Sequence, residues 1–139
     1  MTAYFDTSAF VKLFILEPGS ATVATAWNGA DMLASGRSMY VETRATLAAA
    51  QRQGRITRQG LAKAKHSLKQ HWADLDVWEF VEPIVEHAGD LAEQHVLCGY
   101  DAVHLATAIA AGADLLVRSD TDILRAGPVC GLSVVDSSE

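Results

Sequence analysis

Tyr4-Phe5-Asp6-Thr7-Ser8-Ala9, residues 4 to 9, is the stretch from which the fold can be worked out. A short apolar run ends at an acid, and the hydroxyl of Thr7 or Ser8 can then cap a helix that continues to about residue 14. The chain is therefore predicted to open with a strand, a tight turn and a helix.

Short apolar runs alternate with helical patterns along the rest of the chain. Further strands are predicted near residues 32–34, 77–81, 115–117 and 132–135, and helices near 20–27, 37–53, 57–72, 83–96, 101–111 and 121–125. Parallel strands need crossover connections and bury both faces of their sheet. We expect an α/β protein, a three-layer α/β/α sandwich with a central parallel sheet and an inserted helical hairpin.

Length and composition limit the possible classes of protein. A chain of 139 residues that is 50% hydrophobic suits a single domain over residues 1–139. No run approaches the roughly 18 apolar residues of a membrane span, and the start does not resemble a secretory signal. We expect a cytoplasmic protein that does not bind membranes, with Cys98 and Cys130 as buried free thiols.

Four acids occupy positions that a parallel sheet would bring to one edge. Asp6 ends the first strand, Asp120 follows the fourth by two residues, Glu42 lies early in a helix, and Asp101 begins one. Sites in open parallel sheets form beyond the carboxyl ends of the strands. We expect these four carboxylates to converge on one rim of the sheet.

Such a cluster is unfavourable unless a cation neutralises it, and oxygen-only ligands favour Mg²⁺ or Mn²⁺. A metal held there can activate water to hydrolyse a phosphodiester. Taken singly, each acid has an ordinary structural explanation as a turn or first-turn residue, but one metal site accounts for all four. Thr7 and Ser8 are candidates to hydrogen-bond the acids, although helix capping explains at least one hydroxyl.

Two nearby residues have weaker claims to a role in the site. Asp122 makes a D-x-D pair with Asp120, but Arg125 and Gly131 at the sixth and twelfth positions exclude an EF-hand. His104 lies one helical turn after Asp101, and its apolar neighbours favour a partly buried, satisfied histidine over a catalytic one.

Four segments together resemble the PIN-domain family, and among its members the VapC-type toxin ribonucleases of type II toxin–antitoxin systems. These segments are Tyr4 to Ala9, Tyr40-Val41-Glu42, Asp101 to Ala108 and Val117 to Asp120, and the resemblance spans about residues 2 to 136. It implies that the family's metal-binding acids correspond to Asp6, Glu42, Asp101 and Asp120, with Asp122 as an auxiliary and Thr7 and Ser8 at hydroxyl positions.

The resemblance also implies an activity and partners. Similar proteins are Mg²⁺- or Mn²⁺-dependent endoribonucleases that form homodimers and are silenced by a cognate antitoxin. One departure concerns Arg118, which stands where relatives often carry Thr or Ser. Its side chain can contact substrate phosphate or pair with an acidic neighbour, and the sequence does not separate these roles.

The basic residues are concentrated in one region, although the net charge is −6. Seven of the eleven Lys and Arg residues lie between Thr43 and Ala73, a stretch without Asp or Glu. Because RNA affinity comes mainly from basic side chains, we predict that Arg52, Arg55 and Arg58 contact the RNA substrate. The alternative is a solvated hairpin whose charges only keep it soluble.

Other functions remain as alternatives. A haloacid-dehalogenase-like phosphatase needs a second Asp two residues after the first, where this chain has Ser8. A receiver domain requires consecutive acids at the first strand end. A catalytically silent PIN-like module that binds RNA or protein is the non-enzymatic alternative, and the complete set of four acids argues against it.

Overall fold

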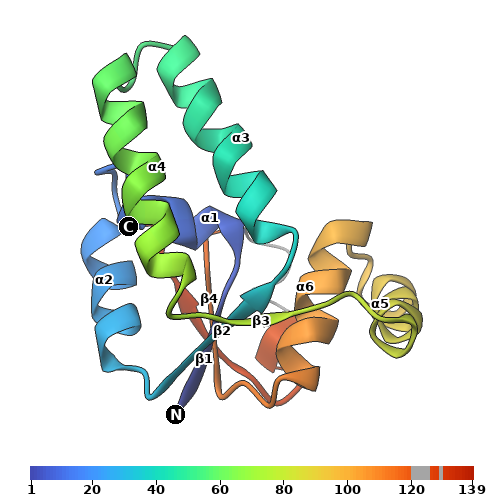
Figure 1. Ribbon diagram of the computed structural model, residues 1–139. Coiled ribbons are helices and arrows are strands. Elements are labelled where there is room, and N and C mark those ends of the chain that lie inside the picture. The colour runs from blue at the N-terminus through green and yellow to red at the C-terminus, as the bar shows by residue number, and fades with distance from the viewer. Residues whose placement is uncertain (120–125, 129) are drawn as a thin grey trace.

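The computed structural model describes residues 1–119, 126–128 and 130–139. Within these ranges five parallel strands form one sheet in the order β3-β2-β1-β4-β5 (Figure 1). The strands are β1 (Thr2–Phe5), β2 (Met32–Gly36), β3 (Asp76–Trp78), β4 (Leu115–Arg118) and β5 (Ser133–Asp136). The predicted parallel α/β/α architecture is confirmed.

The helices follow the predicted pattern closely. They are α1 (Thr7–Phe10) with a 3-10 turn after it (Val11–Leu13), α2 (Ser20–Gly29), α3 (Met39–Arg52), α4 (Arg58–Trp72), α5 (Glu82–His95) and α6 (Gly99–Ala110). The helix predicted over 121–125 lies outside the described residues. The strand predicted over 77–81 instead spans Asp76–Trp78, because these residues pair with Ala34, Ser35 and Gly36 at the end of β2.

Helices cover both faces of the sheet, and alternate strand residues supply the two cores. Phe5 packs on one face with Phe10 of the first helical turn and Trp27 of α2. Tyr4, its neighbour in β1, belongs to the opposite core with Leu91 of α5 and residues of α6. Figure 1 shows α1 and α2 on one side of the sheet and α5 and α6 on the other. Burial of both faces is what a parallel sheet requires.

Helices α3 and α4 form the predicted hairpin, which projects beyond the sheet (Figure 1). Leu47, Ala50 and Ala64 are buried between its helices and Ile15. Thr57 caps α4, as predicted, by accepting a hydrogen bond from the Gly60 amide at 2.9 Å. Cys98 and Cys130 are free, as expected, but Cys98 is exposed and Cys130 only partly buried.

The strand order reverses between β1 and β4. The chain proceeds from β1 outward through β2 to β3, and then places β4 on the other side of β1. The crevice beyond the carboxyl ends of two such strands is where open α/β sheets bind ligands. No helix among the described residues is long and apolar enough to cross a bilayer.

Candidate active site

Asp6 lies at this reversal point, immediately after β1, and it is the residue that caps α1. Its carboxylate accepts hydrogen bonds from the Ser8 amide, at 2.8 Å, and from the Ser8 hydroxyl. The prediction that Thr7 or Ser8 caps this helix is therefore wrong. The extended backbone of Asp6 (φ −96°, ψ 165°) directs its own side chain at the free amides, which leaves the two hydroxyls available to the acids.

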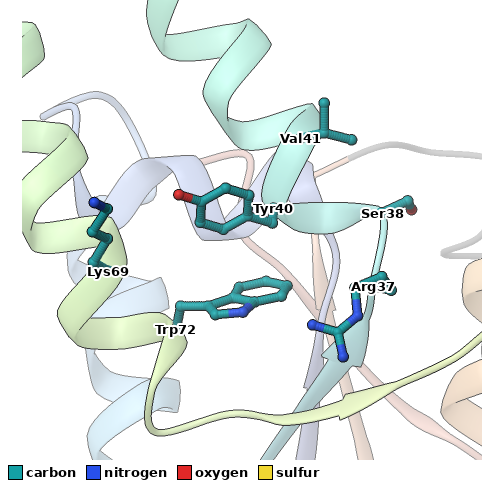
Figure 2. A pocket seen from close by; sticks show the side chains of 6 residues that line it. All are labelled: Arg37, Ser38, Tyr40, Val41, Lys69 and Trp72. Atoms are coloured by element: carbon teal, nitrogen blue, oxygen red, sulfur yellow. The ribbon is translucent and has the colours of Figure 1, made fainter.

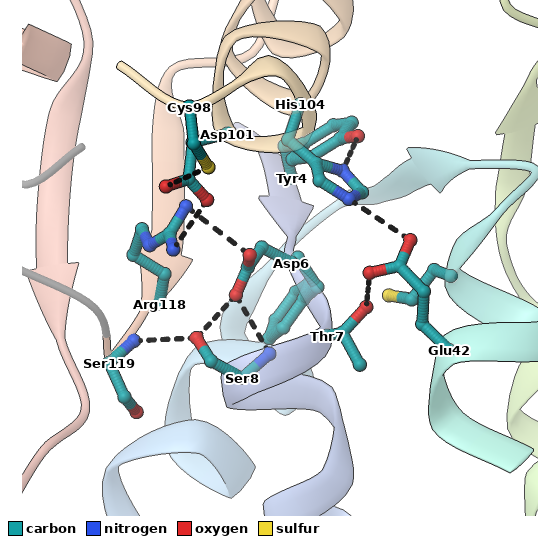
Figure 3. Close-up of polar contacts among 12 residues, drawn as sticks. Tyr4, Asp6, Thr7, Ser8, Glu42, Cys98, Asp101, His104, Arg118 and Ser119 are labelled. Atoms are coloured by element: carbon teal, nitrogen blue, oxygen red, sulfur yellow. Dashed lines mark hydrogen bonds and ion pairs between the residues drawn. The ribbon is translucent and has the colours of Figure 1, made fainter. Parts of the chain in front are cut away.

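A buried arginine connects Asp6 to Asp101 (Figure 3). Arg118 ends β4 and is 1% exposed. Its Nη1 lies 3.3 Å from Oδ2 of Asp6, and its Nη2 lies 3.1 Å from Oδ1 of Asp101, which is in the first turn of α6. The two carboxylates thus face one shared cationic group. Of the two roles that the sequence left open for Arg118, the structure shows pairing with acids.

Neighbouring groups fix the other oxygen of each carboxylate. The Cys98 thiol donates to Oδ2 of Asp101 at 3.0 Å, and this hydrogen bond raises the pKa of Cys98 and keeps its proton in place. The Ser8 hydroxyl also accepts from the Ser119 amide at 2.9 Å, which ties the end of β4 to the start of α1. These contacts hold Asp6 and Asp101 in defined orientations.

Glu42 is held by two hydroxyl groups and by His104. Its carboxylate accepts from the Thr7 hydroxyl at 3.0 Å and from the Ser38 hydroxyl at 2.5 Å, and it lies 3.4 Å from Nε2 of His104. Burial by itself raises the pKa of Glu42, but hydrogen bonds from His104 and Ser38, the electrostatic attraction of His104 and a hydrogen bond from Thr7 outweigh it and lower the pKa to about 2. Glu42 is therefore held as a carboxylate.

His104 lies between Tyr4 and Glu42 and contacts both. The Tyr4 hydroxyl lies 2.8 Å from Nδ1 of His104, and both side chains are buried. Burial raises the pKa of Tyr4 far above its usual range, so the phenol keeps its proton. Nε2, the other ring nitrogen of His104, lies 3.4 Å from Oε1 of Glu42. The expected satisfied histidine is confirmed, and it also positions an acid of the site.

The described acids form one connected site. Asp6 and Asp101 share Arg118, and Thr7, next to Asp6 in the chain, binds Glu42. Asp120 and Asp122 lie outside the described residues. Among the residues that the structure describes, no three His, Cys, Asp or Glu side chains are close enough to hold a metal ion. The oxygen donors of Asp6 and Asp101 nevertheless suit a hard cation, since they already converge on one positive group.

The predicted RNA-binding arginines lie apart from the acids. Arg52 ends α3 and Arg58 begins α4, at the tip of the hairpin. Because an α-helix rises about 1.5 Å per residue, Arg52 lies about 15 Å along α3 from Glu42. Arg55, in the connecting turn, is 3.6 Å from Glu17. All three side chains are exposed and face solvent.

A groove beside the site was not predicted from the sequence. It has a volume of about 600 Å³ and is lined by residues of the β2–α3 turn, the start of α3 and the end of α4: Arg37, Ser38, Tyr40, Val41, Lys69 and Trp72 (Figure 2). The rings of Tyr40 and Trp72 meet edge-on with centroids 5.3 Å apart. Ser38 belongs to both the groove and the Glu42 contacts, so the groove borders the acids. Its signal in the sequence is two aromatic residues at facing ends of the predicted hairpin.

A parallel sheet with acids gathered where the strand order reverses is common to several classes of α/β protein, and comparison identifies the family of this one. The PIN domain family model matches residues 3–128, and the chain belongs to this family. Membership excludes the haloacid-dehalogenase-like and receiver-domain alternatives.

Known relatives support the family, and a solved structure shares the fold. The proteins named Ribonuclease VapC45 and Ribonuclease VapC49, from two strains of Mycobacterium tuberculosis, are each 46% identical over 114 residues, which is 82% of this chain and 79% of theirs. A toxin–antitoxin complex from Klebsiella pneumoniae superposes with a TM-score of 0.70 at 20% identity and covers 97% of both chains.

Proposed function

We propose that this protein is a metal-dependent endoribonuclease that acts as the toxin of a type II toxin–antitoxin module. The observation that carries the proposal is the convergence of Asp6 and Asp101 on one buried cationic group at the reversal of strand order. The names of the 46% identical relatives support the ribonuclease activity. The wider set of acids, Asp6, Glu42, Asp101 and Asp120, is proposed to hold Mg²⁺ or Mn²⁺.

The bound ion would lower the pKa of a water molecule and neutralise the leaving oxyanion of a phosphodiester. The residues of the chain would orient the ligands. Ser8 fixes the rotamer of Asp6 through its amide and hydroxyl. Thr7, Ser38 and His104 keep Glu42 ionised and directed into the site. With donors already in place, little reorganisation is needed when the substrate arrives.

The proposed partners are RNA, a cognate antitoxin and a second copy of the chain. The Klebsiella pneumoniae neighbour was solved as a toxin–antitoxin complex, which supports an antitoxin partner. An acidic site repels RNA until a metal fills it, so basic side chains elsewhere must supply affinity. We propose that Arg52, Arg55 and Arg58 do so from the exposed tip of the hairpin.

The test is a cleavage assay with purified protein freed of any antitoxin. Structured RNA and total RNA are incubated in Mg²⁺, Mn²⁺ or EDTA, and products are mapped by primer extension. Asp6→Asn and Asp101→Asn are compared with Asp90→Asn, which makes the same change on the exposed face of α5. Metal-dependent cuts that disappear only in the first two variants are expected. Folded protein that cuts no RNA with any metal would instead favour the silent binding module.

A further inference from the structure

Arg118 places a permanent positive charge against Asp6 and Asp101, the two carboxylates that are proposed to bind the metal ion. We propose that the Arg118 guanidinium and a divalent ion compete for the same oxygens of Asp6 and Asp101, so that the ion binds there only when Arg118 withdraws. Arg118 is then a positioning residue that sets metal affinity. This inference rests on the proposed metal-dependent function.

The geometry places the guanidinium between the acids. Separate nitrogens of Arg118 contact the two carboxylates, at 3.3 Å for Asp6 and 3.1 Å for Asp101. The side chains are 2% exposed for Arg118, 7% for Asp6 and 15% for Asp101, so solvent screens this cluster poorly. A guanidinium does not lose its proton in proteins, so a change of pH cannot vacate the position.

The remaining oxygens are already engaged. Oδ1 of Asp6 accepts from the amide and hydroxyl of Ser8, and Oδ2 of Asp101 accepts from the Cys98 thiol. The oxygens left to face a metal are Oδ2 of Asp6 and Oδ1 of Asp101, which are the two that Arg118 contacts. Direct coordination of Mg²⁺ needs oxygens at about 2.0–2.1 Å, closer than a guanidinium lying between them permits.

Competition has two opposite consequences. Without metal, Arg118 neutralises the buried Asp6 and the partly buried Asp101, so the protein should be most stable with the arginine in place. With metal, the same charge repels the incoming ion and occupies its ligands, so the arginine should weaken binding. Removing the arginine should therefore lower metal-free stability and raise metal affinity in the same variant.

The test measures Mn²⁺ binding by calorimetry, and thermal unfolding with and without Mn²⁺, for the wild type, Arg118→Ser, Arg118→Gln and Arg118→Lys. The matched control is Arg37→Ser, which removes an exposed arginine that is paired with Glu79 at 2.5 Å. Arg118→Ser and Arg118→Gln are expected to bind Mn²⁺ at least roughly tenfold more tightly, while unfolding at lower temperature without metal. Arg118→Lys and Arg37→Ser should keep affinity near that of the wild type.

A wild-type measurement covers the case in which the Arg118 variants fail to fold. In ¹⁵N NMR of the arginine side chains, titration with diamagnetic Mg²⁺ should shift the Arg118 guanidinium signals and leave those of Arg37 in place. Equal Mn²⁺ affinity in wild type, Arg118→Ser and Arg118→Gln, or Arg118 signals unmoved at Mg²⁺ saturation, would overturn the competition alone. Failure of every folded form to bind Mn²⁺ would overturn the metal centre and the proposed function with it.

Discussion

The two sides of the candidate active site hold their acids by different means. On the arginine side, Asp6 and Asp101 share the buried charge of Arg118. On the hydrogen-bond side, Glu42 accepts from the hydroxyls of Thr7 and Ser38 and lies within reach of His104. The first arrangement compensates two carboxylates with one fixed positive charge, and the second compensates one carboxylate with two hydroxyl donors and a histidine ring.

The difference determines what each side tolerates. A buried ion pair is costly to break, because the partner that remains keeps an uncompensated charge. A carboxylate held mainly by hydroxyl donors can be replaced by an amide, since the amide oxygen still accepts some of the same hydrogen bonds. Activity should therefore depend on both sides, whereas stability should depend mainly on the arginine side.

The largest expected effect is on catalysis, and substitutions on the two sides should reduce it to a similar extent. Asp101→Asn and Glu42→Gln should each reduce metal-dependent RNA cleavage at least about 100-fold, because each removes an anionic ligand worth several kcal/mol to the transition state. Single-turnover cleavage at saturating Mg²⁺ is the measurement, with Asp90→Asn as control. Activity retained by Glu42→Gln alone would remove Glu42 from the metal site.

The free energy of unfolding, in contrast, should differ between substitutions on the two sides. Asp101→Asn should lower the free energy of unfolding by about 3 kcal/mol, because Arg118 is left with less compensation in a buried position. Glu42→Gln should lower it by less than about 1 kcal/mol. Urea unfolding in EDTA measures both values. Equal losses in the two variants would mean that the comparison between the sides is wrong.

A single hydroxyl tests the hydrogen-bond side more gently. Thr7→Val keeps the size of the side chain but removes the donor to Glu42, and it should reduce cleavage roughly tenfold, as losses of ligand-orienting groups do. The expected stability loss is about 1 kcal/mol. Thr25→Val is the matched control, since the Thr25 hydroxyl donates to a backbone carbonyl of its own helix, at 2.9 Å. A full rate in Thr7→Val would show that Glu42 needs no such support.

The smallest effect should come from substitutions at the hairpin tip, away from both sides of the site. Reversing Arg52 and Arg58 to Glu should weaken RNA binding a few-fold at low salt and flatten its salt dependence, because each phosphate contact contributes to counterion release. Mn²⁺ binding should stay unchanged, since the hairpin tip lies about 15 Å along α3 from Glu42. Binding by the wild type and the double variant is compared across a salt titration. Identical curves would move the RNA path elsewhere, and the groove beside Ser38 is the next surface to test.

Local patterns predicted most of the scaffold. Apolar patterns and capping signals identified strands β1 to β5 and helices α1 to α6, and the Thr57 cap of α4 was placed correctly. The prediction failed where pairing controls the outcome. The third strand ends at Trp78 because Gly36, its partner in β2, is the last residue of that strand. Which residue caps α1 also depended on the backbone angles of Asp6, which the residue types alone did not specify.

The sequence by itself determined the family, the layered fold and the identity of Asp6, Glu42 and Asp101 as candidate acids, because short motifs and local burial patterns are written along the chain. Only the tertiary structure decided that Arg118 pairs with Asp6 and Asp101 and that Thr7 pairs with Glu42. Such partners are between 17 and 112 residues apart in the chain, and strand order and crossover geometry bring them together. The balance of charge at the site is therefore a property of the fold.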